Sequence, residues 1–438
     1  MHRLLLSTAA LAAMTATASA QTEIQWWHAM GGELGARLEA VAEGFNASQS
    51  EFKVVPTFKG SYAETLTAAI AAFRAGEQPA IVQVFEVGTG TMMAAKGAVY
   101  PVYQLMADQN EPFDPNAYLP SVVGYYTDTD GNMLSMPFNS STPIVYYNKD
   151  VFEKAGLDRN TPPRTWEEVE AFSRQIIASG AAPCGFTSGW ISWVQLENFS
   201  AWHNQPIGTN ENGFGAIDSQ LTVNGPVQVR HWDNLARWQK EGIFQYGGPV
   251  GGPDAPPKFY SQECAIYMNS SAARAGVLNN VKDFEVGFAM LPYYSDVAGA
   301  PQNSIIGGAT LWVMQNRPAA EYAGVARFFS YISQPEVQAD WSEPTGYLPI
   351  TQAAYEFSRA RGFFDANPGA DTAIRQITLN PPTENSKGLR FGNYVQIRTV
   401  IDEEFQALLG GSKTAQQALD AVVTRGNALI AEFAAANR

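Results

Sequence analysis

The first hundred residues alternate between short apolar runs and amphipathic stretches, and this alternation constrains the fold more than any other feature of the chain. Strands are predicted at 21–27, 52–56 and 80–85, and helices at 34–46 and 62–73, where apolar residues recur at helical spacing. Strands that alternate with helices are typical of a parallel sheet with crossover helices. The sequence therefore predicts an α/β fold.

Three polar residues lie where an α/β sheet of this kind would bind a ligand. Ligands of such sheets gather outside the carboxyl ends of the strands. His28, Tyr62 and Glu86 follow predicted strands directly or lie in the loops after them. Their position nominates them for a site, although a capping or surface role is an equal alternative for each one.

The N-terminus has the form of an export signal. A short basic start precedes an apolar core at 4–14 that is too short to span a bilayer, and Ala18-Ser19-Ala20 has the small-x-small form of a cleavage site. Residues 1–20 are therefore expected to be a cleavable signal peptide, with an unprocessed apolar terminus as the alternative. The residue directly after the predicted cut is Gln21 and not Cys, and no later apolar run is long enough for a membrane helix. The expected location is the periplasm.

The charge balance restricts the partners of the chain. The 438 residues carry a formal net charge of -14, which disfavours nucleic acid and anionic lipid. An anionic ligand would need local donors, such as an Arg, backbone N–H groups or a helix N-terminus. The two cysteines, Cys184 and Cys264, favour one structural disulfide in an exported protein, and two separate buried thiols are the alternative.

No catalytic or metal-binding motif stands out. His28, His203 and His231 share no metal-ligand spacing, and neither a Gly-x-Ser-x-Gly elbow nor a phosphate-binding Gly-x-x-x-x-Gly-Lys loop is present. A pair of cleft carboxylates could still meet among the 42 acidic residues. We therefore expect no metal, no cofactor and no catalytic residue, and rank an enzyme below a binding protein.

Tryptophan is abundant, and three of the ten are better candidates for a site than for the core. Aromatic faces stack on sugar rings and attract alkyl or choline groups. Trp166 follows Thr165 at a predicted helix start, where Glu168 would complete a capping box. Trp190 and Trp193 lie in an exposed-looking loop, whereas Trp202, Trp232, Trp238 and Trp312 are expected in cores.

The stretch 137–157 runs from a polar Asn-Ser-Ser-Thr loop through an apolar strand into a short helix closed by Gly156. It resembles the first hinge crossing of the bacterial extracellular solute-binding proteins of ABC importers. The strands around 305–314 and 345–350 resemble the second and third crossings. The resemblance implies two discontinuous lobes that can close by hinge motion on a ligand between them. It predicts an N-terminal lobe of 21–139 and 307–345, and a C-terminal lobe of 140–306 and 346–438.

Within that family, most of the chain is similar to the receptors for sn-glycerol 3-phosphate. The similarity is carried by Trp27-His28-Ala29-Met30-Gly31-Gly32, Gln83-Val84-Phe85-Glu86-Val87-Gly88, Leu196-Glu197-Asn198-Phe199 and Gly388-Leu389-Arg390-Phe391-Gly392-Asn393. The chain departs from the receptors at Phe58 and Phe85, where they often have Tyr, and in the loops 207–217 and 247–257.

The resemblance implies a ligand site drawn from both lobes. Glu86 would accept hydrogen bonds from the glycerol hydroxyls, with a salt bridge as its alternative role. Arg398 would bind the phosphate with its guanidinium fork, and a surface position on a C-terminal helix is its alternative. Gly308 would bring a backbone N–H close to the ligand. The full set of implied ligand-binding residues is Tyr62, Glu86, Ser141, Trp166, Ser270, Gly308, Tyr347 and Arg398.

The function implied is that of a monomeric periplasmic receptor. It would capture sn-glycerol 3-phosphate, and glycerophosphodiesters such as glycerophosphocholine, and deliver them to the membrane permease of an ABC importer. An oligosaccharide receptor of the same family is one alternative. A secreted glycerophosphodiester hydrolase is the other, and dependence on a metal together with release of product would distinguish it.

Overall fold

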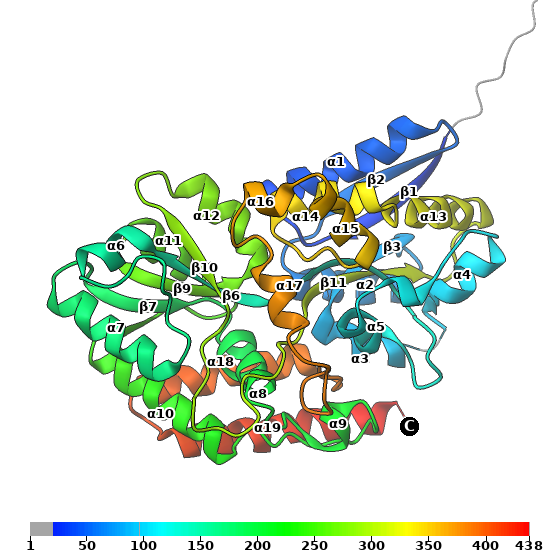
Figure 1. Ribbon diagram of the computed structural model, residues 1–438. Helices are drawn as coiled ribbons and strands as arrows, with labels where there is room; N and C mark the ends of the chain where they lie inside the picture. Colours follow the sequence, from blue (N-terminus) through cyan, green and yellow to red (C-terminus); the bar gives the residue numbers. More distant parts are fainter. Residues whose placement is uncertain (1–20, 96, 438) are drawn as a thin grey trace, which may run out of the picture.

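The computed structural model describes residues 21–95 and 97–437, so the predicted signal peptide at 1–20 lies outside the described residues. Two separate β-sheets organise the chain, and helices cover both (Figure 1). We call the part built on the first sheet the first lobe and the part built on the second sheet the second lobe. The predicted two-lobed α/β fold is therefore confirmed.

The first sheet contains the strands that the opening alternation predicted. Its order is β2 (Phe52–Phe58), β1 (Thr22–His28), β3 (Ile81–Phe85), β11 (Gly307–Met314) and β4 (Val99–Tyr100), and β5 (Met136–Ser141) also pairs with β11. Strand β1 runs parallel to both β2 and β3. Strand β11 is antiparallel to β3, so a strand from late in the chain lies inside this sheet, between β3 and the strands β4 and β5.

The helices of the first lobe pack on these strands. The two predicted helices correspond to α1 (Gly32–Ser48) and α2 (Tyr62–Ala75). Ser61 caps α2 in a capping box with Glu64, which fixes where the helix starts. Further helices on this side include α3 (Thr89–Ala94), α4 (Val102–Asp108), α5 (Pro120–Tyr126), α13 (Ala319–Ile332) and α14 (Pro335–Thr345).

The second sheet has the order β10 (Val286–Ala289), β6 (Pro143–Asn148), β9 (Cys264–Ser270), β7 (Cys184–Ser188) and β8 (Phe244–Tyr246). The remaining helices are α6 (Lys149–Lys154), α7 (Trp166–Ala178), α8 (Phe199–Trp202), α9 (Thr209–Gly213), α10 (Pro226–Lys240), α11 (Ala255–Tyr260), α12 (Arg274–Asn280), α15 (Gln352–Ala360), α16 (Phe363–Ala366), α17 (Thr372–Ile377), α18 (Tyr394–Leu409) and α19 (Ala415–Ala436). None of the helices in the described part of the chain combines the length and apolar character needed to cross a membrane.

Buried hydrogen bonds join the two places where the chain passes between the sheets. Thr142 separates β5 from β6, and its hydroxyl donates to Ser304 Oγ, 2.6 Å away, on the segment that leads into β11. Gln376 of α17 donates to the same Ser304 oxygen at 3.0 Å and to Pro143 O at 2.7 Å. One buried amide therefore fixes both crossings relative to each other.

The third crossing does not follow the predicted lobe division. The segment after Gly346 stays with the first lobe, because Leu348 N donates to Ser140 O and Leu119 N donates to Ile350 O. Helix α15 then packs against α14, which packs against α1 and α13. Residues 346–350 and α15 therefore contact the first lobe, although the predicted division assigns everything after residue 345 to the second lobe.

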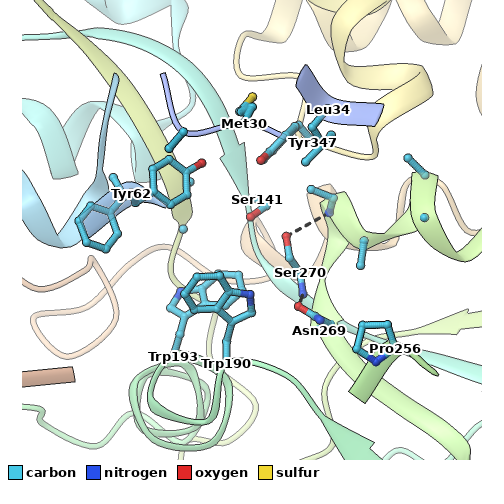
Figure 2. Close-up of a pocket in the computed structure, with 18 of the residues that line it drawn as sticks. Met30, Leu34, Tyr62, Ser141, Trp190, Trp193, Pro256, Asn269, Ser270 and Tyr347 are labelled. Carbon is cyan, nitrogen blue, oxygen red and sulfur yellow. Dashed lines mark hydrogen bonds between the residues drawn. The ribbon is translucent and has the colours of Figure 1, made fainter. Parts of the chain in front are cut away.

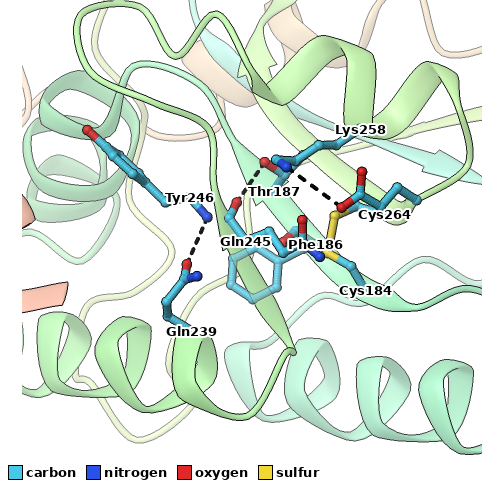
Figure 3. Close-up of a disulfide and its surroundings, with 9 residues drawn as sticks. Cys184, Phe186, Thr187, Gln239, Gln245, Tyr246, Lys258 and Cys264 are labelled. Atoms are coloured by element: carbon cyan, nitrogen blue, oxygen red, sulfur yellow. Dashed lines mark hydrogen bonds and ion pairs between the residues drawn. A yellow bond between two sulfur atoms is a disulfide. The ribbon is translucent and has the colours of Figure 1, made fainter. Parts of the chain in front are cut away.

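The predicted disulfide is confirmed (Figure 3). Cys184 and Cys264 are bonded to each other, and they occupy paired positions on the parallel strands β7 and β9. The bond closes a sequence separation of 80 residues and lies inside the second lobe. Both side chains are fully buried.

Candidate ligand cleft between the lobes

A cavity of about 410 Å³ opens between the lobes and is lined by residues from both (Figure 2). The structure brings together all but one of the predicted site residues in its wall: Tyr62, Glu86, Ser141, Ser270, Gly308, Tyr347 and Arg398. Its size lies within the range of pockets that enclose drug-sized ligands.

The first lobe presents Tyr62 and Glu86 from the ends of its strands and the start of a helix. The capping box of α2 places Tyr62 in the first turn, where its ring stacks on Phe85 with 5.2 Å between centroids. The Tyr62 hydroxyl accepts a hydrogen bond from Asn139 Nδ2 at 3.0 Å, and Asn139 is held in turn by Gln83 at 2.9 Å. Glu86 follows β3 directly, at the carboxyl edge of the sheet.

The second lobe and the hinge provide hydroxyls and backbone groups. Ser270 ends β9, and its Oγ accepts a hydrogen bond from Ala272 N at 3.1 Å, which leaves its own O–H available (Figure 2). Gly308 has a φ of 107°, and a Cβ there would lie 2.0 Å from Asn139 O. Only glycine therefore lets β11 approach β5 this closely, beside the cavity.

Arg398 lines the cavity and forms hydrogen bonds to two carboxylates. Its Nε and Nη2 donate to Glu197 Oε1 at 2.9 Å and Oε2 at 2.6 Å, a bidentate pair. Nη2 also donates to Glu86 Oε1 at 2.7 Å. Glu86 thus makes the salt bridge that was its alternative role. We call these three residues the Arg398 triad.

The triad is buried and carries more negative than positive charge. Glu197 is fully buried, Glu86 is 4% exposed and Arg398 is 8% exposed. Burial raises the pKa of Glu197, and Arg398 opposes that rise. Burial alone would lower the pKa of Arg398, but the two carboxylates hold it above its ordinary value. With all three groups ionised, the triad has a net charge of -1.

Trp166 is the predicted site residue that the structure does not bring to the cleft. It is 3% exposed and packs in the core of the second lobe, against His231 at 4.6 Å and Trp238 at 5.7 Å between ring centroids. The predicted capping box of Thr165 and Glu168 is present, and it fixes the start of α7 with the indole facing the core. Trp190 and Trp193 do line the cavity, but Trp193 is buried in a π-helical turn instead of an exposed loop.

His28 has a local role. It is 2% exposed, and its Nδ1 accepts a hydrogen bond from Met30 N at 3.3 Å. Burial lowers its pKa to about 4, so the ring is neutral at neutral pH. The next residues, Ala29 and Met30, line the cavity in its place.

Sequence reasoning missed Glu197 and Asn269. Asn269 lines the cavity next to Ser270, and Glu197 stands behind Arg398. The sequence carried one signal for Glu197, because it is a lone acid among the apolar residues Val194, Leu196 and Phe199. Charged side chains are almost never fully buried unless they are paired. Among the described residues, no group of three or more His, Cys, Asp or Glu side chains could hold a metal ion.

Comparisons with known proteins show the family of the chain. The sequence profile of the family described as bacterial extracellular solute-binding protein matches residues 40–372. The chain is 49% identical over 438 residues to the sn-glycerol-3-phosphate-binding periplasmic protein UgpB of Yersinia pseudotuberculosis serotype I (strain IP32953), covering 100% of this chain and 99% of the relative. The protein of that name from Salmonella typhimurium (strain LT2) is 49% identical over 428 residues, covering 97% of this chain and 96% of the relative.

Solved structures show the same fold. UgpB from Mycobacterium tuberculosis in complex with glycerophosphocholine superposes with a TM-score of 0.76 at 20% identity, covering 94% of this chain and 99% of that chain. The GacH receptor of Streptomyces glaucescens, solved unliganded and with acarbose, superposes with a TM-score of 0.75 at 17% identity, covering 94% and 98%.

Proposed function

The chain belongs to the bacterial extracellular solute-binding proteins, and from this membership we propose that it is the periplasmic substrate-binding protein of an ABC importer for sn-glycerol 3-phosphate and glycerophosphodiesters. One observation carries the proposal. Glu86 of the first lobe and Arg398 of the second meet at 2.7 Å in the wall of the cleft, in a chain 49% identical over its full length to a relative named for binding glycerol 3-phosphate.

The polar groups of the cleft suit a polyol phosphate. Glu86 accepts hydrogen bonds from the glycerol hydroxyls, and the hydroxyls of Ser141, Ser270 and Tyr347 donate to the phosphate oxygens. Arg398 offers Nη1, which has no hydrogen-bond partner among the described residues. Because these groups come from both lobes, the contacts are complete only when the lobes are closed, which makes ligand binding and closure one equilibrium.

A head group beyond the phosphate is favoured by the aromatic wall. Trp190 and Trp193 line the cavity together with Tyr260, and indole faces attract quaternary ammonium groups. These rings support glycerophosphocholine as the second ligand. An oligosaccharide would also stack on such rings, and it is the alternative ligand within the family.

In the cell, the protein acts outside the cytoplasmic membrane. Residues 1–20 direct export and are removed, and the mature receptor is a monomer that delivers its ligand to the membrane permease without binding nucleic acid. It performs no chemistry on the ligand. A secreted hydrolase of glycerophosphodiesters is the competing function, and turnover would distinguish it from a receptor.

Calorimetric titration of the mature protein tests the proposal. The protein is first unfolded and refolded to remove ligand carried through purification, then titrated with glycerol 3-phosphate, glycerophosphocholine and maltose. We expect one-to-one binding of both phosphate compounds without turnover. Binding of maltose alone, or heat that continues as product accumulates, would contradict the proposed ligand or the receptor function.

A further inference from the structure

We propose that Glu197 is a positioning residue that orients Arg398 and sets the charge of the cleft, so that the cleft prefers a zwitterionic glycerophosphodiester to a doubly charged phosphate monoester. The inference rests on the proposed receptor function. It adds the residue that determines which ligand charge the cleft favours. Glu197 does not line the cavity; it acts through Arg398, which does.

The contact geometry ties one side of the guanidinium to Glu197. Both carboxylate oxygens of Glu197 accept bonds from it, through Nε at 2.9 Å and Nη2 at 2.6 Å. A bidentate pair of this kind fixes the plane of the guanidinium as well as its position. Because Glu197 is fully buried, little freedom remains for Arg398 to swing toward a ligand.

The pair belongs to one lobe, and the third member of the triad belongs to the other. Glu197 lies in the π-helical turn Trp193–Asn198, which adjoins α8, and Arg398 lies in α18, which packs against α10 and α19. Glu86 reaches them from the first lobe. When the lobes part, Glu86 leaves, and the neutral pair of Arg398 and Glu197 stays together.

The charges in the wall then decide which ligand is tolerated. Arg398 is the one cationic side chain among the described residues that line the cavity, and Glu197 already compensates it. Closure adds Glu86 and brings the triad to a net charge of -1. A phosphate monoester carries nearly two negative charges at pH 7. A choline diester carries one negative and one positive charge, so its repulsion by the triad is offset.

A purely structural role accounts poorly for this carboxylate. Replacing a buried ion pair by apolar groups of the same size often leaves stability unchanged or higher. Burial raises the pKa of Glu197 and so opposes its charge, while the charge of Arg398 and its hydrogen bonds act in the other direction. A single carboxylate, Glu86, would suffice to neutralise Arg398. The second one makes the site electronegative, which changes ligand preference instead of stability.

The test compares two ligands on three variants. In Glu197→Gln the shape is kept and one negative charge is removed, and we expect the ratio of the Kd for glycerol 3-phosphate to the Kd for glycerophosphocholine to fall about tenfold. Glu197→Asp keeps the charge, but its shorter side chain holds Arg398 less firmly. The affinity for both ligands should therefore fall, while the ratio of the two Kd values stays within about twofold of the wild type. Glu170→Gln is the matched control, because Glu170 also holds an arginine, Arg237, in a bidentate pair but lies away from the cavity.

The outcomes separate this inference from the proposed function. If neither compound binds the wild-type protein, the proposed function fails. If both bind but Glu197→Gln changes the two affinities by the same factor, the receptor stands and the inference is overturned.

A measurement on the wild-type protein covers the case in which Glu197→Gln does not fold. Titration at pH 7 in buffers of different ionisation enthalpy reports the protons taken up on binding. We expect glycerol 3-phosphate to bind with proton uptake, because an electronegative cleft favours the monoanion, and glycerophosphocholine to bind without it. Equal proton numbers for the two ligands would overturn the inference.

Discussion

Two arginine clusters of the second lobe use the same chemistry in opposite surroundings. In each, a guanidinium fork holds a glutamate by two hydrogen bonds: Arg398 with Glu197 in the cleft, and Arg237 of α10 with Glu170 of α7 on the outside. The side chain of Arg398 is 10% exposed and that of Glu197 is 0% exposed, against 41% for Arg237 and 25% for Glu170.

The difference between the clusters lies in charge balance and in which lobes they join. The outer cluster adds Arg174 and Glu241, so two cations face two anions within one lobe. Solvent screens such a pair, and pairs of this kind contribute little stability. The Arg398 triad is buried, unbalanced by one negative charge, and shared between lobes. An unbalanced buried charge at a cleft is the arrangement expected of a binding site.

The largest expected effect comes from removing the central cation of the Arg398 triad. Arg398→Ala leaves two carboxylates buried without a partner, so the free energy of unfolding should fall by about 3–5 kcal/mol. Ligand binding should weaken by about 2–5 kcal/mol, because a charge-assisted contact is lost from the closed site. Urea unfolding and calorimetric titration measure the two losses. Arg237→Ala is the control, with about 1 kcal/mol or less lost from stability and affinity unchanged.

Removing the disulfide separates loss of stability from loss of recognition. Neither Cys184 nor Cys264 lines the cavity. For a separation of 80 residues, the chain-entropy model gives a loss of roughly 4.5 kcal/mol in the double Ala variant. We expect this drop in urea unfolding while the Kd for either ligand stays as in the wild type. A parallel loss of affinity would mean that stability and ligand recognition in the second lobe are coupled. It would contradict the expectation that only the Arg398 triad affects ligand binding.

A buried histidine, His203, makes the free energy of unfolding depend on pH. His203 accepts a hydrogen bond from Tyr294 N at 2.9 Å, and burial lowers its pKa to about 4 from the ordinary 6.5. The unfolded chain therefore binds this proton first as the pH falls. Stability is highest above pH 6.5 and declines between 6.5 and 4, by about 3 kcal/mol for this group. Urea unfolding of the wild type should show this slope, and His203→Asn should show a shallower one. Equal slopes would contradict the assignment.

The smallest effect is expected at the outer cluster. Hydrogen bonds from Arg237 are the main reason that the pKa of Glu170 is lowered to about 2 from 4.5. The stability this provides is present above pH 4.5 and is lost as the pH falls toward 2. Because the pair is partly exposed, Glu170→Gln should cost less than about 1 kcal/mol at pH 7. Wild type and variant should have the same unfolding midpoint near pH 2, and a persistent difference there would contradict the ionic origin of the effect.

The sequence predicted the local parts of this molecule well. Apolar spacing located β1, α1, β2, α2 and β3, and the cap at Thr165 identified the start of α7. These features depend on residues within one or two turns of each other, so a single sequence contains them. The disulfide could be inferred because only two cysteines were available.

The parts that failed depend on contacts far apart in the chain. Arg398 lies 312 residues from Glu86 and 201 residues from Glu197, so no local pattern could show that Glu197 competes for the guanidinium. Trp166 was misplaced because a first-turn side chain can face either a cleft or a core, and only packing against α10 decides this. The path after Gly346 was set by hydrogen bonds to strand β5 and to Leu119, which spacing does not reveal.

A crystal structure of the refolded protein with glycerophosphocholine would show directly how Glu86, Glu197 and Arg398 share the ligand. We expect the ligand to lie between the lobes, with its glycerol hydroxyls on Glu86, its phosphate within hydrogen-bond distance of Ser270, and Arg398 still held by Glu197. A ligand bound to residues of one lobe only, or an Arg398 that has left Glu197 to clamp the phosphate, would contradict this expectation.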